Sequence, residues 1–140
     1  MGESNFESRI KGDVKDYAKV LMNCLQAGVF SGQSREAAIG SLAYLVEEHD
    51  IVADDVPNIG MLDDAIALVG AAKLLGEVHD LGSAIPRERV EADYAAYQDK
   101  ARMMYTNLGA VSLEGLSAQG RRVENEEELF KTLEDTISLL

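Results

Sequence analysis

Residues 50–72 read DIVADDVPNIGMLDD followed directly by AIALVGAA, and this stretch decides the fold. The first part, Asp50–Asp64, holds five Asp residues around one Pro and one Gly. The second part, Ala65–Ala72, carries no charge, and a helix without a polar face is a buried helix. We therefore expect an acidic connection that leads into a central third helix in the core.

Apolar residues recur at steps of three and four on both sides of this stretch, which is typical of amphipathic helices. Ser34 and Asn125 are suitable N-caps, and Gly28 is a suitable helix stop. No segment alternates with the period of two that indicates a strand, and no internal repeat is evident. The predicted helices are Ser4–Ala27, Ser34–His49, Asp63–Gly76, Pro86–Leu108 and a last helix that follows Asn125.

The segment Gly109–Arg122 holds three Gly and two Ser among apolar residues, so we expect a loop there, with at most a short turn. The length of 140 residues is close to the commonest size of one domain. The sequence thus predicts an all-α fold, a single helical domain over residues 1–140, built as a compact bundle of about five helices.

Composition narrows the class of partner and compartment. The formal net charge is -12 and the pI about 4.5, which disfavours nucleic acid and anionic membrane surfaces. No apolar run approaches the ~20 residues of a membrane span, and the charged start lacks the apolar core of a signal peptide. Cys24 is the lone cysteine, which fits a reducing compartment. We expect a cytoplasmic protein.

The acidic connection is the candidate metal site. Asp50, Asp54, Asp63 and Asp64 supply hard oxygen ligands for Mg²⁺ or Ca²⁺, with His49 as a neighbour. The spacing is not that of an EF-hand, because a glutamate at the twelfth position is missing. The alternative is structural: Asp63 or Asp64 caps the third helix, and the other carboxylates are solvated.

Each histidine precedes an aspartate at a predicted helix end, as His49-Asp50 and His79-Asp80. Such a pair can serve a metal site, or it can simply complement the helix dipole. The two pairs lie at opposite ends of the third helix, about 20 Å apart at about 1.5 Å per residue. We therefore expect a metal site on the acidic connection to leave His79 out.

Signatures of common enzymes are missing. The chain has no G-x-S-x-G, no phosphate-binding loop and no G-x-G-x-x-G. Cys24 lies beside an apolar stripe and is expected to be a buried, inert thiol. Tyr94 and Tyr97 stand three residues apart on one helix face, where core packing is the ordinary role.

Several positions of the acidic connection match a known signature, roughly D-L-I-P-D-x-I-P-x-x-G-x-L-D-D. The matching residues are Asp50, Asp54, Pro57, Gly60, Leu62, Asp63 and Asp64. This segment resembles the DUF1232 or YkvA-like family, a bacterial domain of unknown function, over about Leu42–Leu75. The resemblance implies a helical domain and no particular activity.

Two functions remain open from the sequence. The first is a non-enzymatic, cytoplasmic helical interaction module that acts through a protein partner or as a homodimer. The Tyr and Met side chains of the later helices would provide the contact surface. The alternative is a divalent-metal-binding protein or metal-dependent enzyme centred on Asp50–Asp64. The first hypothesis involves no cofactor, and the second involves Mg²⁺ or Ca²⁺.

Overall fold

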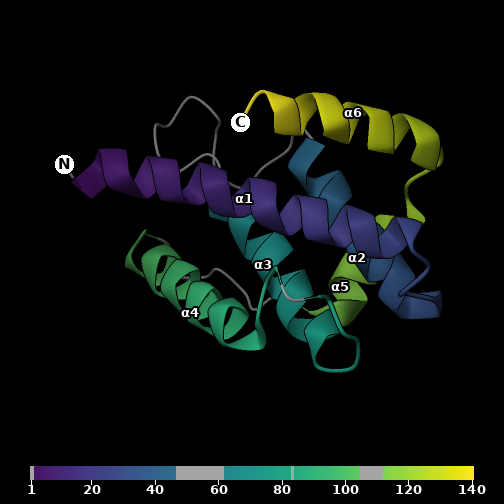
Figure 1. Cartoon of the computed structure of the whole chain (residues 1–140), viewed down its shortest axis with the longest axis horizontal. Coiled ribbons are helices and arrows are strands. Elements are labelled where there is room, and N and C mark those ends of the chain that lie inside the picture. Colours follow the sequence, from purple (N-terminus) through teal and green to yellow (C-terminus); the bar gives the residue numbers. More distant parts are fainter. Residues whose placement is uncertain (1, 47–61, 83, 105–111) are drawn as a thin grey trace.

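The computed structural model describes residues 2–46, 62–82, 84–104 and 112–140, except for the side chains of residues 2–7, 63 and 104. Within these ranges the chain forms six helices and no strand (Figure 1). The prediction of an all-α fold is confirmed for this part of the chain. The helices are α1 (Gly2–Gln26), α2 (Gly32–Val46), α3 (Leu62–Gly76), α4 (Arg87–Met104), α5 (Leu113–Arg121) and α6 (Glu126–Ser138).

Within the described residues α3 contacts four helices, α1, α2, α4 and α5, while α6 packs against α1 and α2. In Figure 1, α1 crosses the molecule with α6 on one side and with α3 and α4 on the other. Every residue from Asp64 to Ala72 is buried, and Leu68 is 0% exposed. The many Ala residues of this segment present short side chains, so neighbouring helices can approach on several sides.

The prediction of a loop over Gly109–Arg122 is wrong for the part that the structure describes, because α5 lies there. Ser112 caps the helix: its Oγ accepts a hydrogen bond from the backbone N–H of Gly115 at 3.0 Å. Burial of Leu116 against the core supplies stability that the Gly-rich sequence alone does not indicate. The helix count is therefore six within the described residues, against about five expected.

Other predicted helix ends can be compared directly. Asn125 caps α6 as predicted, since its Oδ1 accepts from the Glu128 N–H at 3.1 Å. Gly28 follows the end of α1 with φ of +74°, a backbone conformation that glycine adopts readily. The N-cap assignment of Ser34 is wrong, because α2 already begins at Gly32. No helix of the described part is long and apolar enough to cross a bilayer.

Candidate functional site

The predicted metal ligands divide between described and undescribed parts of the chain. His49, Asp50 and Asp54 lie outside the described residues. Asp63 and Asp64 lie in the first turn of α3, which begins at Leu62, and a carboxylate such as that of Asp64 complements the helix dipole there. Asp64 is 5% exposed. Within the described ranges no three His, Cys, Asp or Glu side chains gather closely enough to hold a metal ion. The four-Asp site therefore stays a prediction.

His79 lies in the connection between α3 and α4 and contacts the start of α2. Its Nε2 is 3.2 Å from the Oγ of Ser34, within hydrogen-bond distance. Its ring meets the Phe30 ring edge-on, with centroids 5.3 Å apart. These contacts fix the connection against α2 and give His79 a structural role.

Arg, Asp and Tyr recur at steps of four on α1 and α4, two helices joined by long side chains. A step of four places three side chains along one helix face. We call these six residues the clasp: Arg9, Asp13 and Tyr17 of α1, and Arg89, Asp93 and Tyr97 of α4.

The two tyrosines of the clasp make reciprocal hydrogen bonds. The Tyr17 hydroxyl donates to Asp93 Oδ2 at 2.8 Å, and the Tyr97 hydroxyl donates to Asp13 Oδ2 at 2.5 Å. Each carboxylate thus accepts from the tyrosine of the opposite helix. The pattern has a local two-fold relation, with the two helix segments running antiparallel.

The two arginines also pair across the helices, each with the aspartate of the opposite helix. Arg89 donates from Nη2 to Asp13 Oδ1 at 3.0 Å and from Nε to Asp93 Oδ2 at 3.3 Å. Arg9 donates from Nη2 to Asp93 Oδ1 at 3.2 Å, and its Nε lies 3.6 Å from Asp13. The Arg89 guanidinium stacks 5.4 Å from the Tyr17 ring centroid, and a guanidinium over an aromatic face is attractive.

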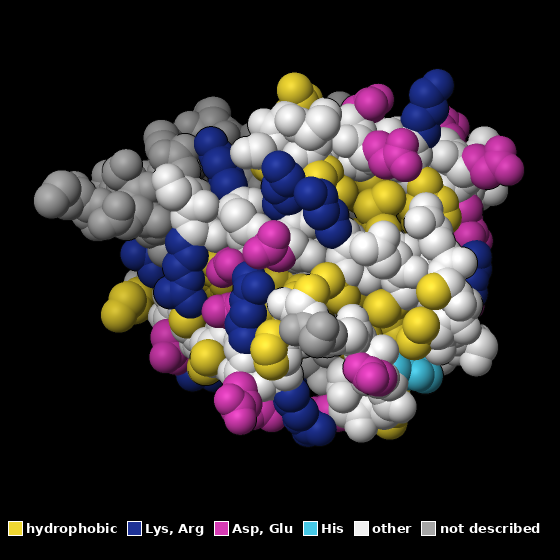
Figure 2. Space-filling view, in the orientation of Figure 1, with side chains coloured by type: hydrophobic (Ala, Val, Ile, Leu, Met, Phe, Trp, Pro, Cys, Tyr) yellow, Lys and Arg dark blue, Asp and Glu magenta, His cyan; other side chains and the backbone are white. Residues whose placement is uncertain are grey.

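The clasp connects helices whose backbones are not close. Among the described residues, α4 approaches only α3 within 8 Å between Cα atoms, and α1 has no such contact with α4. Figure 2 shows basic and acidic side chains interspersed over the region between α1 and α4. Long polar side chains therefore set the position of α4 relative to α1.

The combined effect of burial and neighbouring charged groups raises the pKa values of Tyr17, Tyr97 and Arg89 in the clasp. Burial raises the pKa of Tyr17, and its hydrogen bond to Asp93 raises it further. The pKa of Tyr97 is raised by burial and by its hydrogen bond to Asp13. Burial alone would lower the pKa of Arg89, but hydrogen bonds to Asp16 and Asp13 outweigh this and raise it. The phenols stay protonated and the guanidinium charged, so the clasp acts as a structural connector.

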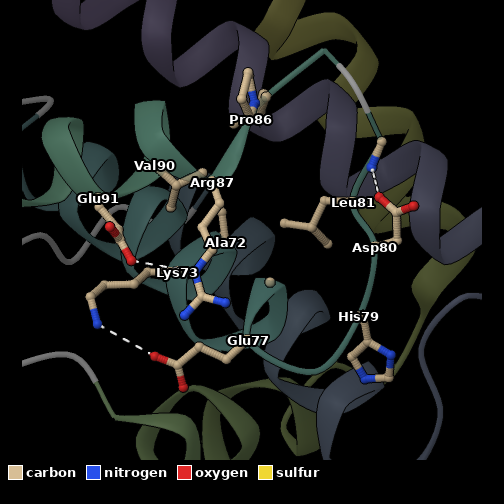
Figure 3. Close-up of a pocket in the computed structure, with 13 residues that line it drawn as sticks. Ala72, Lys73, Glu77, His79, Asp80, Leu81, Pro86, Arg87, Val90 and Glu91 are labelled. Atoms are coloured by element: carbon tan, nitrogen blue, oxygen red, sulfur yellow. Dashed lines mark hydrogen bonds and ion pairs between the residues drawn. The ribbon is translucent and has the colours of Figure 1, made fainter.

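A cavity of about 190 Å³ lies at the corner between α3 and α4 (Figure 3). Its floor is apolar and buried, formed by Ala72, Ile85 and Val90. Leu81 also lines it, and a Cβ atom on Gly76 would lie 3.5 Å from the Leu81 Cδ1. This is an ordinary van der Waals distance, so the Leu81 side chain packs over the end of α3.

The rim of this cavity carries two ion pairs, one at the end of α3 and one in α4. Lys73 Nζ of α3 lies 3.6 Å from Oε1 of Glu77, in the turn that follows the helix, and Arg87 Nε of α4 lies 3.3 Å from Glu91 Oε1. Both pairs have i, i+4 spacing. The rim therefore presents positive and negative groups side by side above an apolar floor.

A shallower groove of about 360 Å³ lies between α1 and α6. Its floor includes the buried side chains of Met22 and Ile137. Lys15, Lys19 and Glu134 also line it, and neither ammonium has an ion-pair partner among the described residues. Two lysines against one glutamate leave the groove lining with a small excess of positive charge on a strongly acidic chain.

Comparison with known proteins gives no relative: no family model matches, and neither a curated protein nor a solved structure matches. The resemblance of Asp50–Asp64 to the DUF1232 signature stays a prediction. Most of that segment lies outside the described residues.

The sequence pattern predicted core packing for Tyr97 and did not identify the clasp. The available signal was the spacing R-x-x-x-D-x-x-x-Y, which occurs from Arg9 to Tyr17 and again from Arg89 to Tyr97. The expectation of no internal repeat overlooked this short match. The partnership itself needs the tertiary arrangement, because the two segments are 80 residues apart in the numbering.

Proposed function

We propose that the chain is a non-enzymatic, cytoplasmic helical module that acts by binding another protein. The groove between α1 and α6 is the observation that carries this proposal. Its apolar floor, with Met22 and Ile137, suits the apolar face of a helix or extended segment. Methionine adapts well to varied apolar partners.

Charge defines the kind of protein segment that suits the groove. Lys15 and Lys19 are positive in a chain whose net charge is -12, so the groove differs from its surroundings. Complementary charge steers association and selects partners. An acidic, amphipathic segment of a partner is the expected ligand, and a second copy of the chain is one possible source of it.

The hydrogen bonds of the clasp also support a non-enzymatic role. Its carboxylates, phenols and guanidinium groups hydrogen-bond to one another across α1 and α4. Groups committed in this way stabilise an arrangement of helices and are poorly placed to exchange protons with a substrate. This leaves binding, with α3 as the supporting core, as the function that the geometry favours.

Affinity capture and light scattering test the proposal. The double variant Lys15→Glu, Lys19→Glu should lose captured protein or self-association, because charge reversal repels an acidic segment. Lys131→Glu is a control for the reversal of a single lysine: Lys131 is exposed on α6 and does not line the groove, so this variant should retain binding. A strict monomer that captures nothing, or equal loss in the control, would argue against this function.

Divalent-metal binding or metal-dependent catalysis is the second candidate, on Asp50, Asp54, Asp63 and Asp64. The burial of Asp64 favours it, since a buried carboxylate has a restricted position, as a metal ligand requires. Calorimetric titration with Mg²⁺ and Ca²⁺, with elemental analysis of the purified protein, tests this function. Heat that disappears in Asp64→Asn would support it, and the lack of both heat and bound metal would exclude these two ions.

A further inference from the structure

The cavity at the α3–α4 corner is separate from the groove of the proposed function and has the size of a small-molecule site. Its volume is about 190 Å³, and a cavity of about 150 Å³ accepts a molecule as large as benzene. Ala72, Ile85 and Val90 are buried beneath it, so the floor offers apolar contact to a short aliphatic group.

Arg87 at the rim can bind a carboxylate. Its hydrogen bond to Glu91 uses Nε, and its two terminal nitrogens donate to none of the described residues. A guanidinium with free terminal N–H groups binds a carboxylate through two parallel hydrogen bonds. Figure 3 shows the Arg87 guanidinium directed into the space beside Ala72.

Glu77 provides the opposite charge from the turn that follows α3. Its carboxylate lies 3.6 Å from Lys73, which is an ion pair beyond hydrogen-bond distance. No ion pair joins Glu77 to Arg87 within the described part of the chain, although both line the cavity. Figure 3 shows the Glu77 carboxylate turned toward Lys73, with the Arg87 guanidinium on the same rim. The rim therefore offers one partner for an ammonium and one for a carboxylate.

We propose that this cavity binds a small aliphatic α-amino acid as its zwitterion. The carboxylate binds the terminal nitrogens of Arg87, the ammonium binds Glu77, and the aliphatic side chain contacts the floor at Ala72 and Val90. A ligand with only one of the two charged groups would bind either Arg87 or Glu77 and leave the other side chain without a ligand contact.

Calorimetric titration of the full chain with leucine tests this site, with isovalerate and isoamylamine as probes that keep only the carboxylate or only the ammonium. Leucine should bind at least about tenfold more tightly than either probe, because each charge-assisted hydrogen bond contributes to affinity. Amide NMR shifts should centre on Gly76 and Gly82, which line the cavity. Equal affinity for isovalerate, no binding of leucine at millimolar concentration, or shifts elsewhere would overturn the assignment.

Substitutions test whether Arg87 and Glu77 bind the ligand directly or act only through the overall charge of the protein. Arg87→Gln and Glu77→Gln should each weaken leucine binding by about tenfold or more. Arg102→Gln is the control, because Arg102 is also exposed on α4 and pairs with Asp99 at 3.5 Å, outside the cavity lining. If Arg87→Gln does not fold, Glu77→Gln decides the outcome. Equal weakening in Arg102→Gln, or full binding in Glu77→Gln, would refute the site.

Discussion

Gly40 of α2 and Gly120 of α5 lie directly against each other where the two helices cross. A Cβ atom on Gly40 would lie 2.8 Å from the Gly120 backbone nitrogen and 1.9 Å from the Leu116 carbonyl oxygen. A Cβ atom on Gly120 would lie 1.9 Å from the Glu36 carbonyl oxygen. Neither position has room for any other residue unless the backbones separate.

Gly120→Ala should therefore destabilise the fold by about 1–3 kcal/mol or more, the cost of overpacking against atoms that cannot yield. Urea denaturation followed by circular dichroism measures the change. Gly12→Ala is the control, because a Cβ atom there meets nothing within 4 Å in the middle of α1. That change should stabilise by roughly 0.5–1 kcal/mol. Equal midpoints for the two variants would contradict the close crossing.

This crossing also explains why α5 was missed in the sequence. Gly115 and Gly120 indicate a loop by local preference, and Gly40 weakens α2 in the same way. In the structure, Gly40 and Gly120 allow two backbones to approach and bury Leu116 between elements far apart in sequence. A helix that begins with a capping residue can be predicted from the sequence alone. Asn125 and the glutamates that follow it correctly predicted the start of α6.

The candidate sites depend even more on tertiary structure. Asp64 could be singled out from sequence because it belongs to a local acidic run, although Asp50 and Asp54 lie outside the described residues. The cavity is lined both by Glu77, which follows α3, and by Arg87 of α4, and the clasp joins Tyr17 to Asp93. No spacing within one segment reveals such pairs, since a side chain's partner is set by how the helices pack.

Leu68 of α3 should be among the most costly positions to truncate. It is 0% exposed, so Leu68→Ala should destabilise by about 2–5 kcal/mol through lost burial and the cavity left behind. Leu139→Ala is the matched control, since Leu139 is 88% exposed, and should change stability by less than about 0.5 kcal/mol. Similar denaturation midpoints for both variants would show that α3 is not packed as described.

The clasp should stabilise the position of α4 more than that of α6. Tyr17→Phe removes the donor to Asp93 and leaves a nearly buried carboxylate with one hydrogen bond fewer, at a cost of about 1–3 kcal/mol. Hydrogen exchange should rise along Arg87–Met104, because among described residues only α3 otherwise holds this backbone closely. Unchanged exchange in α4, or an equal rise in α6, would show that the clasp does not position the helix.

Alkaline pH should weaken the fold through the same tyrosines. The pKa of Tyr17 is raised first by burial and then by Asp93, and that of Tyr97 by burial and then by Asp13. Tyrosines of the unfolded chain titrate near about pH 10. Below that pH the contribution of both tyrosines is fully present. Above it the unfolded chain releases protons that the folded chain retains, so the free energy of unfolding falls as pH rises.

The double variant Tyr17→Phe, Tyr97→Phe isolates this effect, because it removes both phenols and keeps both rings. Its stability should be lower than that of the unaltered chain at pH 8. The difference should narrow above about pH 10, by up to about 1.4 kcal/mol per pH unit for each tyrosine. Urea denaturation at steps between about pH 8 and 11 measures both curves. Curves that stay parallel over this range would show that the two hydroxyls do not hold their protons more firmly in the folded chain.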